Sequence, residues 1–207
     1  MFQEQAFEIT AQAGAMVGVE KEERLATRWS QSFKFRHPWL QLNLLTAFAA
    51  GAVVGIFEGT VEKLVVLAAF LPVLAGQSGN TGCQALAVTL RGLTLGELKP
   101  GAERMLVMKE AALGFMNGAF TGLIAALGMF AYATMQKSPH ALMLAGVVWL
   151  ALVGACVVSG ICGAMIPLTL KRFGADPATA SSIFLTTATD VVSMGLLLGL
   201  ATILIKL

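Results

Sequence analysis

The sequence predicts an all-α, polytopic membrane protein with five transmembrane helices per protomer and a short cytosolic N-terminal helix. Its composition is the first observation behind this fold class. Of the 207 residues, 57% are hydrophobic and only 13% are charged, and the mean hydropathy is +0.77. A water-soluble domain needs much more polar surface than this. The composition therefore indicates a chain that is solvated by lipid.

Five apolar stretches, each near the roughly 20 residues that cross a hydrocarbon core, are the second observation. They cover about residues 39–57, 64–90, 107–134, 142–168 and 178–205. The residues before them are polar. We therefore divide the chain into a short cytosolic juxtamembrane segment, residues 1–35, and a five-helix transmembrane domain, residues 36–207.

The distribution of basic residues predicts the orientation. In a five-span topology, eleven of the 14 Lys and Arg residues fall on the same side as the N-terminus. Because cytosolic loops are enriched in Lys and Arg, the N-terminus is expected in the cytosol and the C-terminus outside. We expect a multi-pass protein of the cell inner membrane.

Glycines spaced four residues apart predict close helix packing, because small residues let transmembrane backbones approach. Three such sets stand in the first, third and fifth stretches: Gly51 and Gly55; Gly114, Gly118 and Gly122; Gly195 and Gly199.

Asp190 is the most informative polar residue. It lies near the middle of the last apolar stretch, where a carboxylate costs about 2.5–3.5 kcal/mol on insertion scales and usually faces a wet cavity or a partner. No Lys, Arg or His lies at a comparable depth in any stretch. Thr179, Ser182 and Thr186 precede Asp190 at helical spacing and form one stripe with it. This stripe predicts a pore lining in which a cation neutralises Asp190.

The second apolar stretch supplies a matching polar face. Its polar residues follow Pro72 and are interspersed with glycines; they are Gln77, Asn80, Thr81 and Gln84. Pro72 removes a backbone hydrogen bond, and freed carbonyls are tolerated at this depth where they line a water-filled path. A kinked packing helix with satisfied amides is the alternative.

The candidate ligands are oxygens, with no His or Cys cluster, and hard oxygen ligands favour Mg²⁺, with Mn²⁺ and Ca²⁺ as alternatives. Mg²⁺ sheds water reluctantly, so one carboxylate among neutral oxygens suits a partly hydrated ion. A two-fold dimer would supply two copies of Asp190. We take the metal site as Asp190, Thr186, Ser182 and Asn80, and the pore lining as Gln77, Thr81, Gln84 and Thr179.

Two further features bear on partners. Asp176 precedes Pro177 at the start of the fifth stretch, where it is expected to cap the helix, and it could also hold cations at the cytosolic mouth. The net charge of +2, without a basic run interleaved with aromatic residues, argues against a nucleic-acid partner.

Several motifs together resemble the membrane domain of the MgtE family of magnesium channels and transporters. They run in order from about residue 36 to the C-terminus: Arg36-His37-Pro38-Trp39-Leu40, Gly79-Asn80-Thr81-Gly82, Arg91-Gly92, Lys109-Glu110, Asn117-Gly118, Ile166-Pro167-Leu168, Asp176-Pro177-Ala178 and Thr186-Thr187 with Thr189-Asp190. The individual motifs are short, and their combination is specific.

The resemblance implies a homodimer with a pore at its interface, lined by the second and fifth helices of each protomer. It also implies that Asp190 contacts hydrated Mg²⁺, that Thr186 and Ser182 face the same site, and that Asp176 lies near the cytosolic opening. Typical members carry a large cytosolic N-terminal region with paired CBS domains that close the pore. Only some 35 residues precede the first stretch here, so we expect gating by such domains to be lacking.

Two rival functions are weighed against a transporter. Gly76-Gln77-Ser78-Gly79 fits the pattern of an intramembrane serine protease, which needs a histidine base. The two histidines, His37 and His140, lie at or beyond the ends of the apolar stretches, so we expect no enzyme. Sodium-coupled exchange of divalent cations is the second rival, and the sequence does not distinguish it from conduction.

Overall fold

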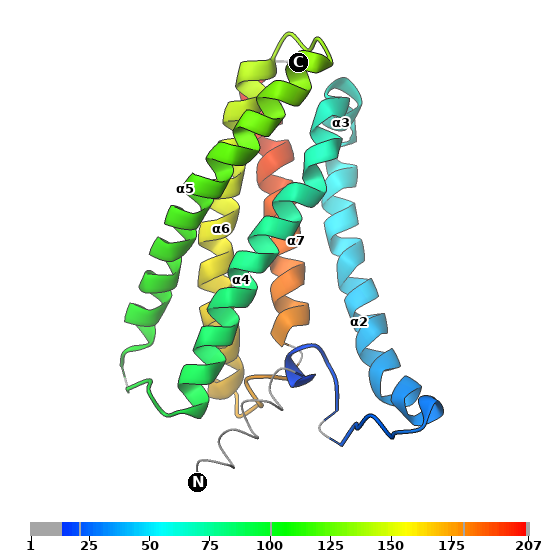
Figure 1. The fold of residues 1–207 in the computed structure, drawn as a ribbon, viewed down its shortest axis with the longest axis vertical. Helices are drawn as coiled ribbons and strands as arrows, with labels where there is room; N and C mark the ends of the chain where they lie inside the picture. Colours follow the sequence, from blue (N-terminus) through cyan, green and yellow to red (C-terminus); the bar gives the residue numbers. More distant parts are fainter. Residues whose placement is uncertain (1–13, 21, 100, 180, 206–207) are drawn as a thin grey trace.

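The computed structural model describes residues 14–20, 22–99, 101–179 and 181–205. Within these ranges the chain is helical and contains no strand (Figure 1). The elements, in chain order, are α2 (Trp29–Ile56), α3 (Glu58–Lys63), the 3₁₀ helix η1 (Val65–Phe70), α4 (Leu71–Thr94), α5 (Glu103–Met135), α6 (Ala141–Arg172) and α7 (Ser181–Leu204). The predicted all-α class is confirmed for these residues.

Four of the described helices are long and apolar enough to cross a membrane, namely α2, α5, α6 and α7. Helix α4 has the same length as α7, 24 residues. At 1.5 Å per residue both reach about 36 Å, which exceeds the hydrocarbon core of about 30 Å. Helix α4 differs from the other four because its residues are, on average, the least hydrophobic of the five helices.

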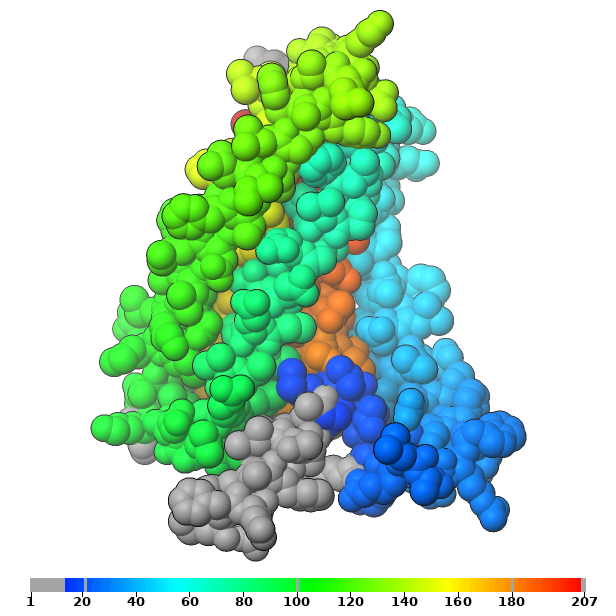
Figure 2. All heavy atoms as spheres, in the orientation of Figure 1, coloured from blue at the N-terminus to red at the C-terminus, as the bar shows by residue number. Residues whose placement is uncertain are grey.

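Helix α6 lies at the centre of the bundle and packs against α5, α4 and α7, while α2 packs along α7 (Figure 1). The largest core cluster joins these helices through side chains with no more than 1% exposure, such as Leu74, Met129, Leu152 and Leu197. Helices α2 and α4 diverge toward the end of the molecule that holds the N-terminal segment. The adjoining half of α7 is therefore visible in a furrow between them (Figure 2).

The glycine stripe predicted on the third apolar stretch forms the α5–α6 contact. A methyl group at Gly114 would overlap the carbonyl oxygen of Cys156, and one at Gly118 would lie 2.8 Å from Cα of Val153. From the other helix, a methyl group at Gly160 would overlap the carbonyl oxygen of Glu110. These glycines let the two backbones touch directly, as their spacing predicts.

Replacing Gly160 with alanine is expected to lower the stability of the bundle by about 1–3 kcal/mol, the usual cost of overpacking. The obstacle is a backbone carbonyl of α5, which cannot rotate away. On the same helix, a methyl group at Gly146 would have no neighbouring atom within 4 Å, so Gly146→Ala is the matched control. The measurement is thermal unfolding of both variants in detergent. Equal midpoints for the two variants would contradict tight α5–α6 packing at Gly160.

Three helix features differ from the expectations. Helix α2 begins at Trp29, ten residues before the expected start at 39, because the polar residues there continue the same helix. The loss of a helical hydrogen bond expected at Pro72 is wrong, and so is the alternative of a kink there, because α4 begins at Leu71 and is continuous to Thr94, with Pro72 in its first turn. An N–H there has no partner within the helix, so proline is accommodated at no cost.

The third difference concerns a pair of glycines on α2. A methyl group added at Gly51 or Gly55 would have no atom within 4 Å, so this pair faces open space instead of a neighbouring helix. Much of the expected N-terminal helix, residues 1–13, lies outside the described residues. Of the residues described before α2, residues 14–16 are helical.

Candidate functional site

The polar stripe predicted on the last helix belongs to the N-terminal half of α7, which is the half visible in the furrow (Figure 2). Of its members on α7, Thr186 is exposed, while Ser182 and Asp190 are half-buried. The hydroxyl of Thr186 donates to the carbonyl oxygen of Ser182 at 2.8 Å. This bond uses the hydroxyl proton and leaves oxygen lone pairs free to accept from water. Such a surface suits an ion that arrives with its water shell.

The carboxylate of Asp190 has no hydrogen bond and no ion pair with any residue that the structure describes. Its backbone carbonyl accepts from the hydroxyl of Ser193 at 3.2 Å, which fixes the helix but leaves the acid uncompensated. A half-buried carboxylate without a partner is costly, and a cation is the species that offsets this cost.

Helix α4 meets α7 beside this acid. A methyl group at Gly79 would lie 3.9 Å from Oγ1 of Thr189, and one at Gly82 would lie 2.9 Å from Leu185. Asn80 directly follows Gly79 on α4, and Asp190 directly follows Thr189 on α7. Asn80 and Asp190 therefore lie at the same height along the two helices. Asn80 is exposed. Two of the four residues expected at the metal site therefore lie at one level of the bundle, on neighbouring helices.

Other polar residues of α4 turn away from α7. The hydroxyl of Thr81 donates to the carbonyl oxygen of Gln77 at 3.1 Å and to Sγ of Cys156 on α6 at 3.5 Å. Thr81 and Gln84 line a cavity of about 190 Å³ between α4, α5 and α6. In one protomer these two residues thus lie at a different place from the Asp190 stripe, although all were expected to line one pore.

The same cavity contains an acid that the sequence pattern alone does not single out. The side chain of Glu110 on α5 is 7% exposed, and its Oε1 lies 3.7 Å from Nζ of Lys109. A signal for it exists, because Glu110 stands inside the apolar stretch 107–134. Because Lys109 directly precedes Glu110, the sequence favours a position at the membrane surface for both residues. The burial of Glu110 is therefore not predicted.

The N-terminal segment closes one end of the furrow (Figure 2). The hydroxyl of Ser182 donates to the carbonyl oxygen of Met16 at 2.5 Å. Ala15 joins an apolar cluster with Leu86 of α4 and Leu185 of α7. Gly18 packs directly on Trp39 of α2 with a φ of 79°, a conformation and a close approach that favour glycine. One short segment thus contacts all three walls.

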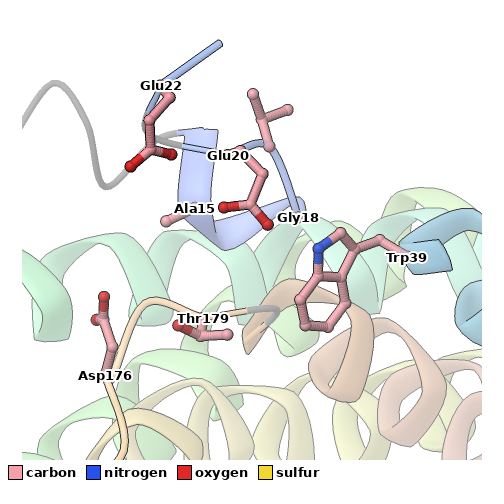
Figure 3. Close-up of a pocket in the computed structure, with 8 residues that line it drawn as sticks. Ala15, Gly18, Glu20, Glu22, Trp39, Asp176 and Thr179 are labelled. Carbon is pink, nitrogen blue, oxygen red and sulfur yellow. The ribbon is translucent and has the colours of Figure 1, made fainter. Parts of the chain in front are cut away.

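Beside this segment lies an acidic cavity of about 240 Å³ (Figure 3). Glu20 and Glu22 enter it from the N-terminal segment, and Asp176 and Thr179 from the loop before α7. Oδ1 of Asp176 accepts from the backbone N–H of Ala178 at 2.9 Å, so this carboxylate caps the turn that leads into α7. Among the described residues no three His, Cys, Asp or Glu side chains are grouped closely enough to hold a metal ion. The cavity is thus lined by three acidic side chains that are not clustered.

Comparison with known proteins decides the family. The model of the MgtE family, described as divalent cation transporters, matches residues 71–200. The chain belongs to the MgtE family. The match covers α4 to α7 and includes the whole Asp190 stripe on α7.

Three curated relatives carry the name magnesium transporter MgtE. The chain is 30% identical to that of Enterococcus faecalis over 96% of its own length, and 33% identical to that of Bacillus subtilis over 81%. It is 30% identical to that of Thermus thermophilus, again over 81%. The chain spans between 36% and 42% of the length of these relatives. The resemblance to the MgtE membrane domain is thereby confirmed.

The protease alternative gains no support from the geometry. The hydroxyl of Ser78 donates to the carbonyl oxygen of Ala75 in its own helix at 3.1 Å. His37 lies on α2 with its ring 4.6 Å from that of Phe33, and His140 directly precedes α6. Neither histidine is bonded to Ser78 in the described part of the chain.

Proposed function

We propose that the chain transports divalent cations, chiefly Mg²⁺, across the membrane in partly hydrated form. The observation that carries the proposal is the half-buried carboxylate of Asp190, which has no partner among the described residues, in the half of α7 that adjoins the furrow. Membership in a family of divalent cation transporters, and the name magnesium transporter of three relatives, support the choice of cargo. Mn²⁺ and Ca²⁺ prefer the same oxygen ligands and are the competing ions.

The proposed transporting unit is a homodimer in which α4 and α7 of two protomers face one another across the furrow. In a single copy the furrow is open on one side (Figure 2), and one carboxylate balances half the charge of a divalent ion. A second copy closes the furrow and supplies the second carboxylate. In two-fold pairing, the commonest symmetry of soluble oligomers, the same surface of each subunit contacts the other. Here that surface would be the furrow side of each protomer.

Helix α4 is proposed as the fifth membrane span. Its buried face packs on α6 and α7, and its polar residue Asn80 is exposed beside the contact with α7. In the proposed dimer this side chain faces the water-filled path, so lipid need not solvate it. Polar residues are accepted within a span where they face a water-filled path. This assignment explains why α4 is less apolar than the four helices around it.

The orientation follows from the basic residues at the end that holds the N-terminal segment. The C-terminal end of α4, the start of α5 and the C-terminal end of α6 meet there (Figure 1). Arg91, Arg104, Lys171 and Arg172 belong to these helix ends. We assign this end to the cytosol and the opposite end, with the C-terminus, to the outside of the inner membrane.

The groups of the site act on the water shell of the ion. Asp190 supplies charge, and the oxygens of Thr186 and Asn80 accept hydrogen bonds from coordinated water. Ser182 is bonded to Met16 in the present arrangement, so its hydroxyl reaches the path when the N-terminal segment withdraws. A shell held by several neutral oxygens and one acid lets Mg²⁺ pass without complete dehydration.

Flux of Mg²⁺ into proteoliposomes that contain an Mg²⁺-sensitive dye tests the proposal. Flux that depends on the protein and is reduced by added Mn²⁺ or Ca²⁺ is expected. Repeating the assay with and without a Na⁺ gradient separates conduction from sodium-coupled exchange. A protein that is folded in the vesicles but moves no divalent cation under either condition contradicts the proposal.

Replacing Asn80 with alanine is expected to reduce Mg²⁺ flux by no more than about tenfold, because water readily substitutes for a neutral ligand of a hydrated ion. Gln84→Ala is the matched control on the same helix, since Gln84 lies at the cavity beside α5. Initial flux rates at several Mg²⁺ concentrations provide the comparison. A loss of flux as complete as that of an Asp190 variant would show that Asn80 contacts the ion directly.

A further inference from the structure

A second surface feature lies at the cytosolic ends of α5 and α6, away from the furrow. It is an open cavity of about 780 Å³ lined by Leu98, the first turns of α5 and the last turns of α6. Three cationic side chains line it: Arg104, Lys171 and Arg172. Val107, Met165 and Leu168 form an apolar wall beside them. The cavity thus joins a cationic end to an apolar one.

The three cations are uncompensated by the residues that the structure describes. None of them has a hydrogen bond or an ion pair from its side chain to another residue in the part of the chain that the structure describes. Glu103 is the acid among the lining residues, so three positive charges meet one negative charge and leave an excess of two. An anion is therefore the complementary ligand.

The depth of the cavity indicates the kind of anion. Helices α5 and α6 have 33 and 32 residues. At 1.5 Å per residue they are about 48–50 Å long, whereas the bilayer with its headgroups is about 40–45 Å thick. Arg104 is the second residue of α5, and Lys171 and Arg172 end α6. These cations lie at the level of the lipid headgroups, and the apolar wall points toward the hydrocarbon.

A neighbouring cavity of about 560 Å³ extends the same surface along α5. It shares Arg104 and is also lined by Met105, Met108 and Lys109. Met105 is 73% exposed and Met108 is 61% exposed. Methionine side chains adapt their shape to irregular apolar partners, which suits flexible acyl chains.

We propose that the larger cavity binds an anionic phospholipid of the cytosolic leaflet. Its phosphate lies between Arg104 on one helix and Lys171 and Arg172 on the other, and its acyl chains cover Val107, Met165 and Leu168. Guanidinium and ammonium groups are the usual partners of phosphate, and basic pockets between transmembrane helices recognise anionic headgroups. The site stands apart from the ion path and does not depend on which ion is transported.

The test compares two double variants with the same change of charge at the same end of the protein. Arg104→Gln with Lys171→Gln removes two cations of the cavity, and Arg91→Gln with Lys99→Gln removes an Arg and a Lys outside it. Native mass spectrometry of the detergent-solubilised protein counts bound phosphatidylglycerol as its concentration rises. We expect at least about tenfold weaker binding for the cavity variant and less than about twofold for the other. Equal weakening in both would indicate diffuse surface charge and overturn the proposal.

Two further arms identify the ligand. Phosphatidylcholine, which has no net charge, is expected to bind the wild-type cavity at least about tenfold more weakly than phosphatidylglycerol. Met165→Gln is expected to weaken phosphatidylglycerol binding, because it makes the acyl wall polar at a side chain that is already 48% exposed. If glycerol 3-phosphate displaces phosphatidylglycerol at equal concentration, the cavity binds a free phosphate and the lipid assignment is wrong.

Discussion

Replacing Asp190 with asparagine is expected to lower Mg²⁺ flux by about tenfold to a hundredfold. A unit charge pair 4 Å apart is worth about 4 kcal/mol at an effective dielectric constant of 20, and each 1.4 kcal/mol is a factor of ten. A divalent ion doubles the attraction, while its water shell increases the distance. Initial rates in proteoliposomes, at equal protein density, measure the loss. Glu97→Gln removes an exposed acid from the α4–α5 loop and is the control for a simple change of net charge.

Stability separates a role in ion binding from a role in folding. Because the Asp190 carboxylate has no partner among the described residues, Asp190→Asn is expected to unfold at the same temperature as wild type, or higher, without Mg²⁺. Bound ligand raises the stability of the form that binds it. Added Mg²⁺ should therefore raise the midpoint of the wild type more than that of the variant. Wild-type flux in Asp190→Asn, or loss of flux together with loss of folding, would contradict the assigned role.

Replacing Ala15 with glutamine is expected to raise the basal Mg²⁺ flux several-fold. Ala15 is 9% exposed in the apolar cluster that includes Leu86, Ala178 and Leu185. Burying an amide there without a hydrogen-bond partner costs on the order of 1–3 kcal/mol. This cost favours withdrawal of the N-terminal segment, which releases Ser182 from Met16 and opens that end of the furrow. Flux at low Mg²⁺ concentration is the measurement.

The control for this variant lies in the same segment. Ala26 is exposed, so Ala26→Gln makes the same chemical change without disturbing a packed contact. It should transport like the wild type. Protease accessibility of the N-terminal segment should rise in Ala15→Gln alone. If flux is unchanged while the segment becomes accessible, closure by this segment does not limit the movement of the ion.

The membrane class and most helix positions could be predicted from the sequence, because the length of an apolar stretch is a property of consecutive residues. The residue at which α4 starts could not be predicted in this way. Residues 65–70 are as apolar as those that follow, yet they form the 3₁₀ helix η1, and α4 begins only at Leu71. Composition does not distinguish a 3₁₀ helix from an α-helix. Pro72 is accepted in the first turn of α4, so it marks the start of α4 only when the boundary with η1 is already known.

Asp190 could be found from the sequence alone, because the cost of a charge in an apolar stretch depends on the residue and its depth. The directions of its polar neighbours could not be read in the same way. Thr81 meets Cys156 across 75 positions of the chain, and Ser182 meets Met16 across 166. Such contacts are set by how helices cross in three dimensions. The sequence by itself thus determined a lipid-solvated helical chain with one costly acid. The tertiary structure decided which polar groups lie at the level of that acid and which segment contacts the helices around the furrow.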